Sequence, residues 1–214
     1  LPIIVAIMLN EVKRSRLRKT SQTILYAPHF ISTVVVCAMA LMFIKQDGGL
    51  INVLIEMFGG EAKDWISYPK TFPLIYTLSG LWTDLGWGTI LYLAAIAGIN
   101  PSLYEAAEVD GANHFQRVWH VTIPCILPTI TTLLILDIGG LVGSGASFEK
   151  VFLLYNPMTY ETADIISTFV FRLGLGSGNY SYSTAVNLFE SFLNLGLLTI
   201  ANKVSKKITG SGLW

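Results

Sequence analysis

The chain contains 214 residues, of which 52% are apolar and 13% are charged, and its mean hydropathy is +0.57. This composition excludes an ordinary soluble domain and predicts a membrane protein. The formal net charge is zero, so the chain lacks the clustered basic excess typical of nucleic-acid-binding proteins. Cys37 and Cys125 lie in apolar runs without CxxC spacing, which favours buried small hydrophobes over metal ligands or a disulfide.

In chain order, the first apolar stretch is LPIIVAIML, at residues 1–9. It is shorter than the roughly 20 residues that cross a bilayer, and no Met precedes it. We therefore expect a partial span in a sequence that lacks its N-terminus. Complete spans are predicted at residues 23–44, 72–98, 123–143 and 182–201. Together they indicate a single all-α, multi-span membrane domain over residues 1–214.

The distribution of basic residues predicts which loops face the cytoplasm. If the spans alternate, residues 10–22, residues 99–122 and the tail after Ala201 share one side, which holds nine of the 14 Lys and Arg residues. The positive-inside rule assigns this side to the cytoplasm and the loops 45–71 and 144–181 to the outside. Within the second outer loop, the apolar run IISTFVFRLGL is too short to cross and predicts an interfacial or re-entrant helix.

A polar stretch at residues 105–124, EAAEVDGANHFQRVWHVTIP, separates two of the predicted spans on the cytoplasmic side. Just before it, Asn100 and Pro101 form a good helix start, since the first residue can cap and the second suits the first turn. Ser102 and Glu105 offer a capping box in an alternative register. Either register predicts a helix that begins here.

This first helix is expected to end at Gly111, in the left-handed conformation that glycine adopts easily. Asn113 can then cap a second helix, which Pro124 ends or kinks. The first helix has one thin stripe, made of Leu103, Ala106, Ala107 and Asp110. One face of the second is made of Phe115, Val118, Trp119 and Thr122. The stretch therefore predicts a compact helix-turn-helix at the cytoplasmic membrane surface.

Three interpretations of this helix-turn-helix compete. A DNA-reading motif would need basic residues facing phosphates, but the segment sets Arg117 against Glu105, Glu108 and Asp110. An amphipathic connector resting on the bilayer would account for Phe115 and the other aromatic residue, but it gives no reason for the small alanine face. A thin alanine surface favours the third interpretation, which is close docking by a protein partner.

At this point the residues resemble the EAA loop of binding-protein-dependent ABC importer permeases. The family pattern is EAA, three residues, G, nine residues, I, one residue, LP. In this chain EAA occupies residues 105–107 and Gly111 follows at the family's spacing, while Val121 stands for the I and Ile123-Pro124 for the LP. The resemblance implies a multi-span helical fold of the MetI-like type.

The resemblance also implies a role for the loop, which in this family is a coupling helix seated in a cleft of a separate ATPase subunit. Carried over residue by residue, the coupling positions are Glu105, Ala106, Ala107, Asp110, Gly111, Ile123 and Pro124. No G-x-x-x-x-G-K-[ST] occurs in the chain, so we do not expect it to hydrolyse ATP or to be an enzyme. No cofactor is expected either.

Two flanking stretches, YAPHFIS at residues 26–32 and the tail TGSGLW, resemble the carbohydrate branch of the family, especially permeases for plant-polysaccharide oligosaccharides in Gram-positive bacteria. This implies a multi-pass protein of the bacterial plasma membrane that imports a sugar or oligosaccharide. The implied partners are ABC ATPase subunits, a second related permease and an extracellular solute-binding protein.

Three acidic residues lie within predicted spans, where an ionised carboxylate costs roughly 2.5 to 3.5 kcal/mol. They should face a cavity or a polar partner, and together with nearby aromatic and amide residues they can line a sugar path. The main candidates are Trp82, Asp84, Asp137, Asn187 and Glu190, followed by Trp87, Tyr92 and Asn194. The alternative is that the aromatic residues form interfacial belts and the acids bond to neighbouring helices.

Two other functions would use the same acids. An ion-coupled secondary transporter would combine intramembrane carboxylates with broken helices. Asp84 with Gly86 and Gly88, or Asp137 with Gly139 and Gly140, can supply both features. An intramembrane aspartyl protease would need two facing aspartates with a family motif, and LDIGG around Asp137 lacks the usual preceding glycine. The three histidines share no ligand spacing, so no metal site is predicted.

Overall fold

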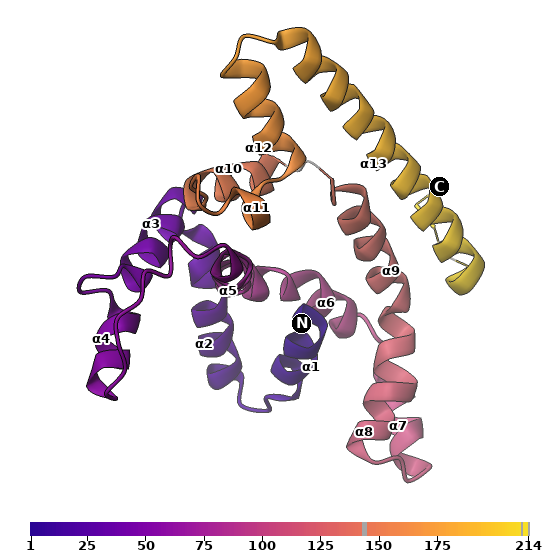
Figure 1. Cartoon of the computed structure of the whole chain (residues 1–214). Helices are drawn as coiled ribbons and strands as arrows, with labels where there is room; N and C mark the ends of the chain where they lie inside the picture. Colours follow the sequence, from indigo (N-terminus) through magenta and orange to yellow (C-terminus); the bar gives the residue numbers. More distant parts are fainter. Residues whose placement is uncertain (143–144, 211, 214) are drawn as a thin grey trace. The chain divides into compact units, whose positions relative to one another are not determined.

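The computed structural model describes residues 1–142, 145–210 and 212–213, and these residues form helices and short connections without any strand, which confirms the all-α prediction. Figure 1 shows their arrangement along the chain. The longer elements are α1 (Pro2–Glu11), α2 (Ser15–Tyr26), α3 (Thr33–Ile44), α4 (Leu50–Met57), α5 (Phe72–Trp87), α6 (Thr89–Ala97), α7 (Pro101–Val109), α9 (Ile123–Gly139), α10 (Gly145–Leu154) and α13 (Tyr180–Thr209). The short ones are η1 (Ala27–Phe30), η2 (Pro69–Thr71), α8 (His114–Arg117), α11 (Tyr160–Ala163), α12 (Ile166–Val170) and the π-helical turns η3 (Val118–Thr122) and η4 (Phe171–Leu175).

The chain divides into two compact units, each built from segments that lie far apart in the sequence. Unit 1 contains Leu1–His29, Asp84–Gly139 and Asn194–Trp214, and unit 2 contains Phe30–Thr83 and Gly140–Leu193. The sequence alone does not predict this division.

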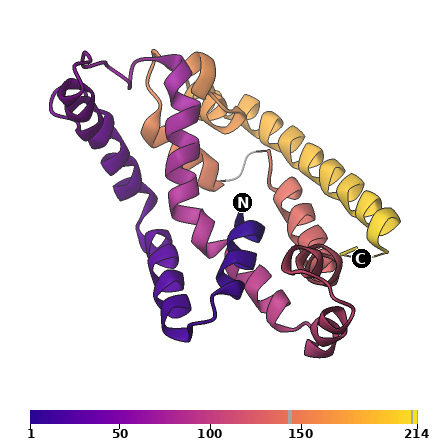
Figure 2. The same ribbon diagram turned by 90° about the horizontal axis from the view of Figure 1, so that it is seen from below.

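The core of unit 1 lies where α1, α6 and α9 meet. Its buried members are Ala6, Tyr92, Ile96 and Ile126. α1 and α6 lie side by side in both views (Figures 1 and 2). Their close packing depends on Gly88, because a Cβ there would come within 3.1 Å of Pro2 Cγ. The short apolar helix α1 is therefore fixed by helices from the middle of the chain.

The core of unit 2 joins α3, α5, α10 and α11. Its buried members are Cys37, Phe72, Val151, Leu154 and Ala163. Cys37 is buried, as predicted, but Cys125 is exposed on α9, and both thiols are free. The prediction that both cysteines are buried is therefore wrong for Cys125. An apolar side chain in a membrane span has no need of burial within its own chain, because lipid solvates it equally well.

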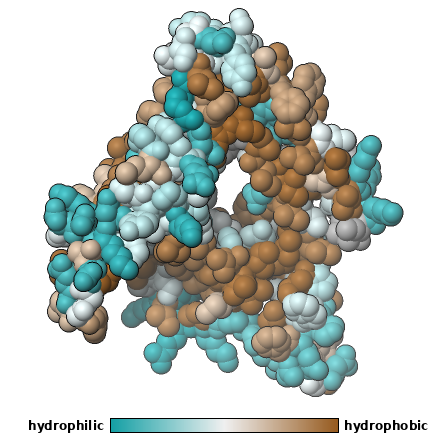
Figure 3. Space-filling view, viewed as in Figure 1, coloured by the Kyte–Doolittle hydropathy of each residue, from teal (hydrophilic) through white to brown (hydrophobic). Residues whose placement is uncertain are grey.

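Much of the hydrophobic surface is exposed within this single chain. Figure 3 shows hydrophobic side chains along α9, whereas the surface over α7 and α8 is mostly polar. The exposed apolar residues of α9 include Leu127, Leu134 and Leu136. Such surfaces are expected where helices face lipid or another membrane subunit.

Among the described residues, two helices are long and apolar enough to cross a membrane, namely His114–Gly139 and Tyr180–Lys207. The first begins before the predicted span 123–143 and ends earlier, and Gly143 lies outside the described residues, as do Ser211 and Trp214 of the tail. A third span results if two bent helices, Ser15–Phe30 and Thr33–Ile44, are counted together as one broken span.

The predicted span 23–44 is not one straight helix. The segments on either side of residues 31–32 meet at an angle of 95°. Pro28 lies in η1 and has no N–H to continue an α-helical ladder, while the Ser32 side chain accepts a hydrogen bond from Val35 N at 3.4 Å and begins α3. The predicted span 72–98 is likewise divided, into α5 and α6, at Gly88. Hydropathy detects neither break, because the apolar character continues through both.

A buried asparagine organises the predicted outer loop 45–71. The Asn52 side chain is 1% exposed and donates from Nδ2 to the backbone oxygens of Lys45, Gln46 and Lys63. Its Oδ1 accepts from Lys63 N at 3.1 Å and from Trp65 Nε1 at 2.8 Å. One side chain thus satisfies groups along most of this loop and gives it a defined conformation.

Candidate coupling surface and intramembrane acids

The helix that carries the EAA sequence begins as the first of the two predicted registers. The Asn100 side chain accepts a hydrogen bond from Ser102 N at 3.1 Å, and Pro101 occupies the first turn of α7. This cap satisfies a backbone donor that has no partner within the helix. α7 then runs to Val109, with Asp110 as its C-cap.

α7 ends in a left-handed turn, as predicted. Gly111 has a φ of 74°. Gly111 N donates to Glu108 O at 3.0 Å, and Ala112 N donates to Ala107 O at 2.9 Å, the pair of bonds that defines a Schellman motif. A Cβ on Gly111 would meet nothing within 4 Å. The requirement for glycine is therefore set by the backbone conformation and not by a lack of space.

The second helix begins at Asn113 with a complete capping box. Asn113 Oδ1 accepts from Gln116 N at 2.9 Å, and Asn113 N donates to Gln116 Oε1 at 2.8 Å. Only three residues separate the end of α7 from this cap. The turn between the two helices is thus determined almost entirely by local hydrogen bonds.

Pro124 does not end the second helix, contrary to one of the predicted outcomes. The helix passes from α8 through the π-turn η3 into α9 without interruption. Ile123 N donates to Val118 O, five residues back, and Pro124 follows directly. The change of hydrogen-bond register thus falls directly before Pro124, a residue that has no N–H to donate.

The π-turn also divides the predicted face of the second helix. Phe115 and Trp119 are 79% and 64% exposed, Val118 is half-buried, and Thr122 is buried. The π-turn changes the helical register between Phe115 and Thr122, and Thr122 packs against Tyr104 of α7. The prediction of a single face is therefore wrong at its C-terminal end.

Three contacts hold this helix-turn-helix together. Tyr104 Oη on α7 lies 2.9 Å from Thr122 Oγ1 on η3. Arg117 Nη1 lies 3.6 Å from Glu108 Oε2, so the basic residue of the stretch faces α7. His114 Nδ1 lies 3.6 Å from Glu11 at the end of α1. The motif is fixed to itself and to the core of unit 1.

The predicted coupling residues are accessible on this support. Those exposed are Glu105, Ala106, Asp110, Gly111 and Pro124, and those half-buried are Ala107 and Ile123. Sequence reasoning missed Val109, which is 87% exposed at the end of α7. The spacing within EAAEV was the available signal, because Val109 follows Ala106 by three residues and therefore lies on the same side of the helix as this coupling position.

The predicted sugar-path residues belong to both units. In unit 1, Asp84 Oδ1 lies 3.4 Å from His29 Nδ1, and the His29 ring stacks on Trp87 with centroids 4.3 Å apart. Asp137 is exposed on α9. The acids of unit 1 thus keep access to ligands or partners, although the Asp84 carboxylate already lies close to the His29 ring within its own unit.

In unit 2, the other three candidates have different surroundings. Trp82 lines a cavity of about 510 Å³ between α3, α4 and α5 whose wall is almost wholly apolar. Asn187 is exposed on α13, whereas Glu190 on the same helix is only 8% exposed. The apolar surroundings of Trp82 do not favour a sugar contact there.

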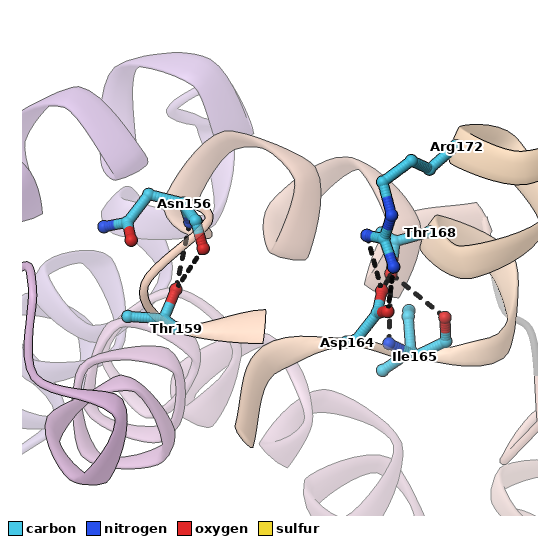
Figure 4. A network of polar contacts seen from close by, with 6 residues as sticks. All are labelled: Asn156, Thr159, Asp164, Ile165, Thr168 and Arg172. Carbon is cyan, nitrogen blue, oxygen red and sulfur yellow. Dashed lines mark hydrogen bonds and ion pairs between the residues drawn. The ribbon is translucent and has the colours of Figure 1, made fainter. Parts of the chain in front are cut away.

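A polar network that the sequence did not predict stabilises the second of the two loops predicted to lie outside, residues 144–181 (Figure 4). Arg172 donates to both carboxylate oxygens of Asp164, and Thr168 Oγ1 donates to Asp164 Oδ1 at 2.7 Å. The bond to Asp164 raises the pKa of the Arg172 guanidinium above its ordinary value. Nearby, Asn156 Nδ2 donates to Ile66 O at 3.0 Å and connects this loop with the loop 45–71. The apolar run at 165–175 is therefore two short helical pieces anchored by an ion pair.

Comparison with known proteins places the chain in a family. Residues 2–209 match the model described as "Binding-protein-dependent transport system inner membrane component". The chain belongs to this family of membrane transport components, which confirms the resemblance read from the EAA stretch.

Individual relatives agree with this membership. The chain is 43% identical over 213 residues to the polygalacturonan/rhamnogalacturonan transport system permease protein YteP of Bacillus subtilis (strain 168), and 42% identical to Protein LplB of the same strain. In each case the match covers 100% of this chain and 66% of the relative, so the chain spans just under two thirds of their length. In the crystal structure of a bacterial alginate ABC transporter with an alginate pentasaccharide-bound periplasmic protein, one chain matches with a TM-score of 0.95 and 42% identity, covering 99% of this chain and 73% of that one.

Proposed function

We propose that this chain is a permease subunit of an ABC importer that translocates a sugar or oligosaccharide delivered by an extracellular binding protein. A separate ATPase subunit drives transport by docking on the EAA loop. The observation that carries this proposal is the rigid turn at Gly111, which holds Glu105 and Ala106 exposed beside the apolar side chains Val109 and Phe115. Small and apolar exposed residues on a fixed support suit close docking by a protein.

The same helix-turn-helix can transmit movement into the membrane. α8, η3 and α9 form one continuous helix of 26 residues from His114 to Gly139, about 39 Å long at 1.5 Å per residue. A displacement of α8 by a docked ATPase is therefore transmitted into the span, since the helix continues from one to the other through the π-turn. Chemical energy released in a partner is in this way converted to movement of the permease.

The proposed partners follow from the relatives. YteP is described as a permease of a polygalacturonan/rhamnogalacturonan transport system, and the alginate transporter was solved with a periplasmic protein that carries a pentasaccharide. For this chain we propose two ATPase subunits, a second related permease and an extracellular binding protein that carries an oligosaccharide of a polysaccharide such as those named for its relatives. The chain itself has no phosphate-binding G-x-x-x-x-G-K-[ST] and performs no catalysis in this scheme.

The decisive experiment is uptake by proteoliposomes that contain the complete complex and the binding protein. Import of a labelled oligosaccharide should require internal ATP and continue at its full rate when an ionophore removes all ion gradients. An ion-coupled secondary transporter would behave in the opposite way, with uptake that survives without ATP and stops with the ionophore. That pattern would replace the proposed function by its alternative.

A second prediction concerns the side on which the coupling loop lies. Ser102 and Glu61 are both exposed, the first on the EAA loop and the second on the loop 45–71. In a chain with Cys37 and Cys125 replaced by alanine, Glu61→Cys should react with a membrane-impermeant maleimide on intact cells. Ser102→Cys should react only after the membrane is opened. Labelling of both from the outside would remove the basis for a cytoplasmic ATPase contact.

A further inference from the structure

Unit 2 contains a pocket of about 410 Å³ between α12 and the N-terminal half of α13. Its volume falls within the range of small-molecule sites, which is about 300 to 1,000 Å³. The lining combines two carboxylates, from Asp164 and Glu190, with three aromatic rings, from Phe169, Tyr182 and Phe189. The pocket is distinct from the EAA loop and from the acids of unit 1.

Glu190 gives this pocket an unsatisfied hydrogen-bond acceptor. The residue is 8% exposed, and among the described residues nothing donates a hydrogen bond to its Oε1. A buried carboxylate oxygen without a donor is costly, so native structures normally supply one. A ligand hydroxyl that donates a hydrogen bond to this oxygen would therefore gain more binding free energy here than at most other positions of the pocket.

Asp164 has no such requirement. Its Oδ1 accepts from Thr168 Oγ1 at 2.7 Å and from Arg172 Nη1 at 3.3 Å, and its Oδ2 accepts from Arg172 Nη2 (Figure 4). The ion pair with Arg172 cancels the charge of Asp164. Glu190 is the other carboxylate of the pocket lining, and no ion pair is recorded for it among the described residues.

This charge distribution restricts the ligand. A divalent cation needs several free oxygen ligands, and no group of three His, Cys, Asp or Glu side chains occurs in the part of the chain that the structure describes. An anionic group would be repelled by Glu190 in a site of low dielectric constant. A neutral ring with several hydroxyls can instead donate to Glu190 and pack its C–H face on the partly exposed rings of Phe169 and Tyr182.

We infer that this pocket binds one neutral sugar ring of the transported oligosaccharide, with the Glu190 carboxylate as hydrogen-bond acceptor. The inference rests on the proposed function and adds a substrate class to it. The site discriminates against a uronate ring, even though the relative YteP is described as a permease of a polygalacturonan/rhamnogalacturonan transport system. The substrate would therefore carry a neutral sugar at the position that enters this pocket.

The test is equilibrium binding to the complete complex in nanodiscs, without the binding protein, using two radiolabelled probes. The probes are galactotriose, which is neutral, and trigalacturonate, which carries three carboxylates. The wild-type complex should bind galactotriose at least about tenfold more tightly than trigalacturonate. Glu190→Gln should weaken galactotriose binding about tenfold, since a charge-assisted hydrogen bond is lost, and should not weaken trigalacturonate binding. Ser191→Ala, an exposed neighbour outside the lining, should bind both probes like the wild type.

Three results would overturn the inference. The first is equal affinity of the wild type for both probes, or no affinity for either. The second is a Glu190→Gln complex that binds galactotriose as well as the wild type. The third is loss of the second permease from Glu190→Gln during purification, which would mean that Glu190 pairs with a basic side chain of that subunit. ATP-dependent uptake by wild-type proteoliposomes is measured in parallel. If this uptake is absent, the proposed function itself is refuted. If it is present together with any of these three results, only the sugar pocket is refuted.

Discussion

Gly111→Val is expected to abolish ATP-driven uptake while leaving the permease folded in the membrane. Gly111 has a φ of 74°, a conformation in which a β-branched residue is strongly disfavoured, with a local cost on the order of 1 to 3 kcal/mol. Relief of that strain requires the end of α7 to unwind, which breaks the bonds from Gly111 N and Ala112 N to the carbonyls of α7. The docking surface is thereby displaced, while the spans keep their own packing.

The matched control is Gly111→Asn, because asparagine tolerates the left-handed region far better than other residues with a Cβ. Space does not limit either variant, since a Cβ at this position meets nothing within 4 Å. Gly111→Asn should therefore keep most of the uptake and of the ATPase retained on a tagged permease, whereas Gly111→Val should lose both. Equal activity of the two variants would show that the left-handed turn has no part in coupling.

The features of this site that the sequence predicts are the local ones. Asn100, Gly111 and Asn113 act through hydrogen bonds to backbone groups within five residues, so residue type and spacing are sufficient to place the caps and the turn. Hydropathy likewise predicts that residues near 123–143 and 182–201 form long apolar helices, because the requirement for about 20 apolar residues is a property of a single segment.

What the sequence does not predict depends on contacts between distant segments. Gly88, where α5 and α6 meet, lies against Pro2 from the start of the chain, and no periodicity within residues 72–98 records that neighbour. The π-turn at 118–122 is a register change that a regular 3.6-residue pattern cannot represent. The burial of Glu190 and the exposure of Asp137 are equally invisible, because both lie in similar apolar runs and differ only in what packs around them.

Phe115→Ala is expected to weaken ATPase docking without affecting the permease itself. Phe115 is 79% exposed, so its removal leaves no cavity in the folded chain. We expect this exposed aromatic side chain to be a hot spot of the interface, a position where truncation costs about 2 kcal/mol or more, which corresponds to about a thirtyfold weaker complex. Val109→Ala, which removes a smaller side chain at 87% exposure, should show the same defect to a lesser degree.

The control for this prediction is Phe58→Ala. Phe58 is 90% exposed but follows α4 in the loop predicted to lie outside the cell, so it presents the same side chain on the opposite side of the membrane. The measurement is the affinity of purified ATPase subunit for permease complexes in nanodiscs, together with oligosaccharide uptake. Phe115→Ala should lose affinity and uptake in parallel, and Phe58→Ala should keep wild-type ATPase affinity. If Phe58→Ala weakens ATPase binding as much as Phe115→Ala does, then the effect is one of general surface hydrophobicity, and the apolar side chains beside the EAA sequence are not the contact through which the ATPase acts.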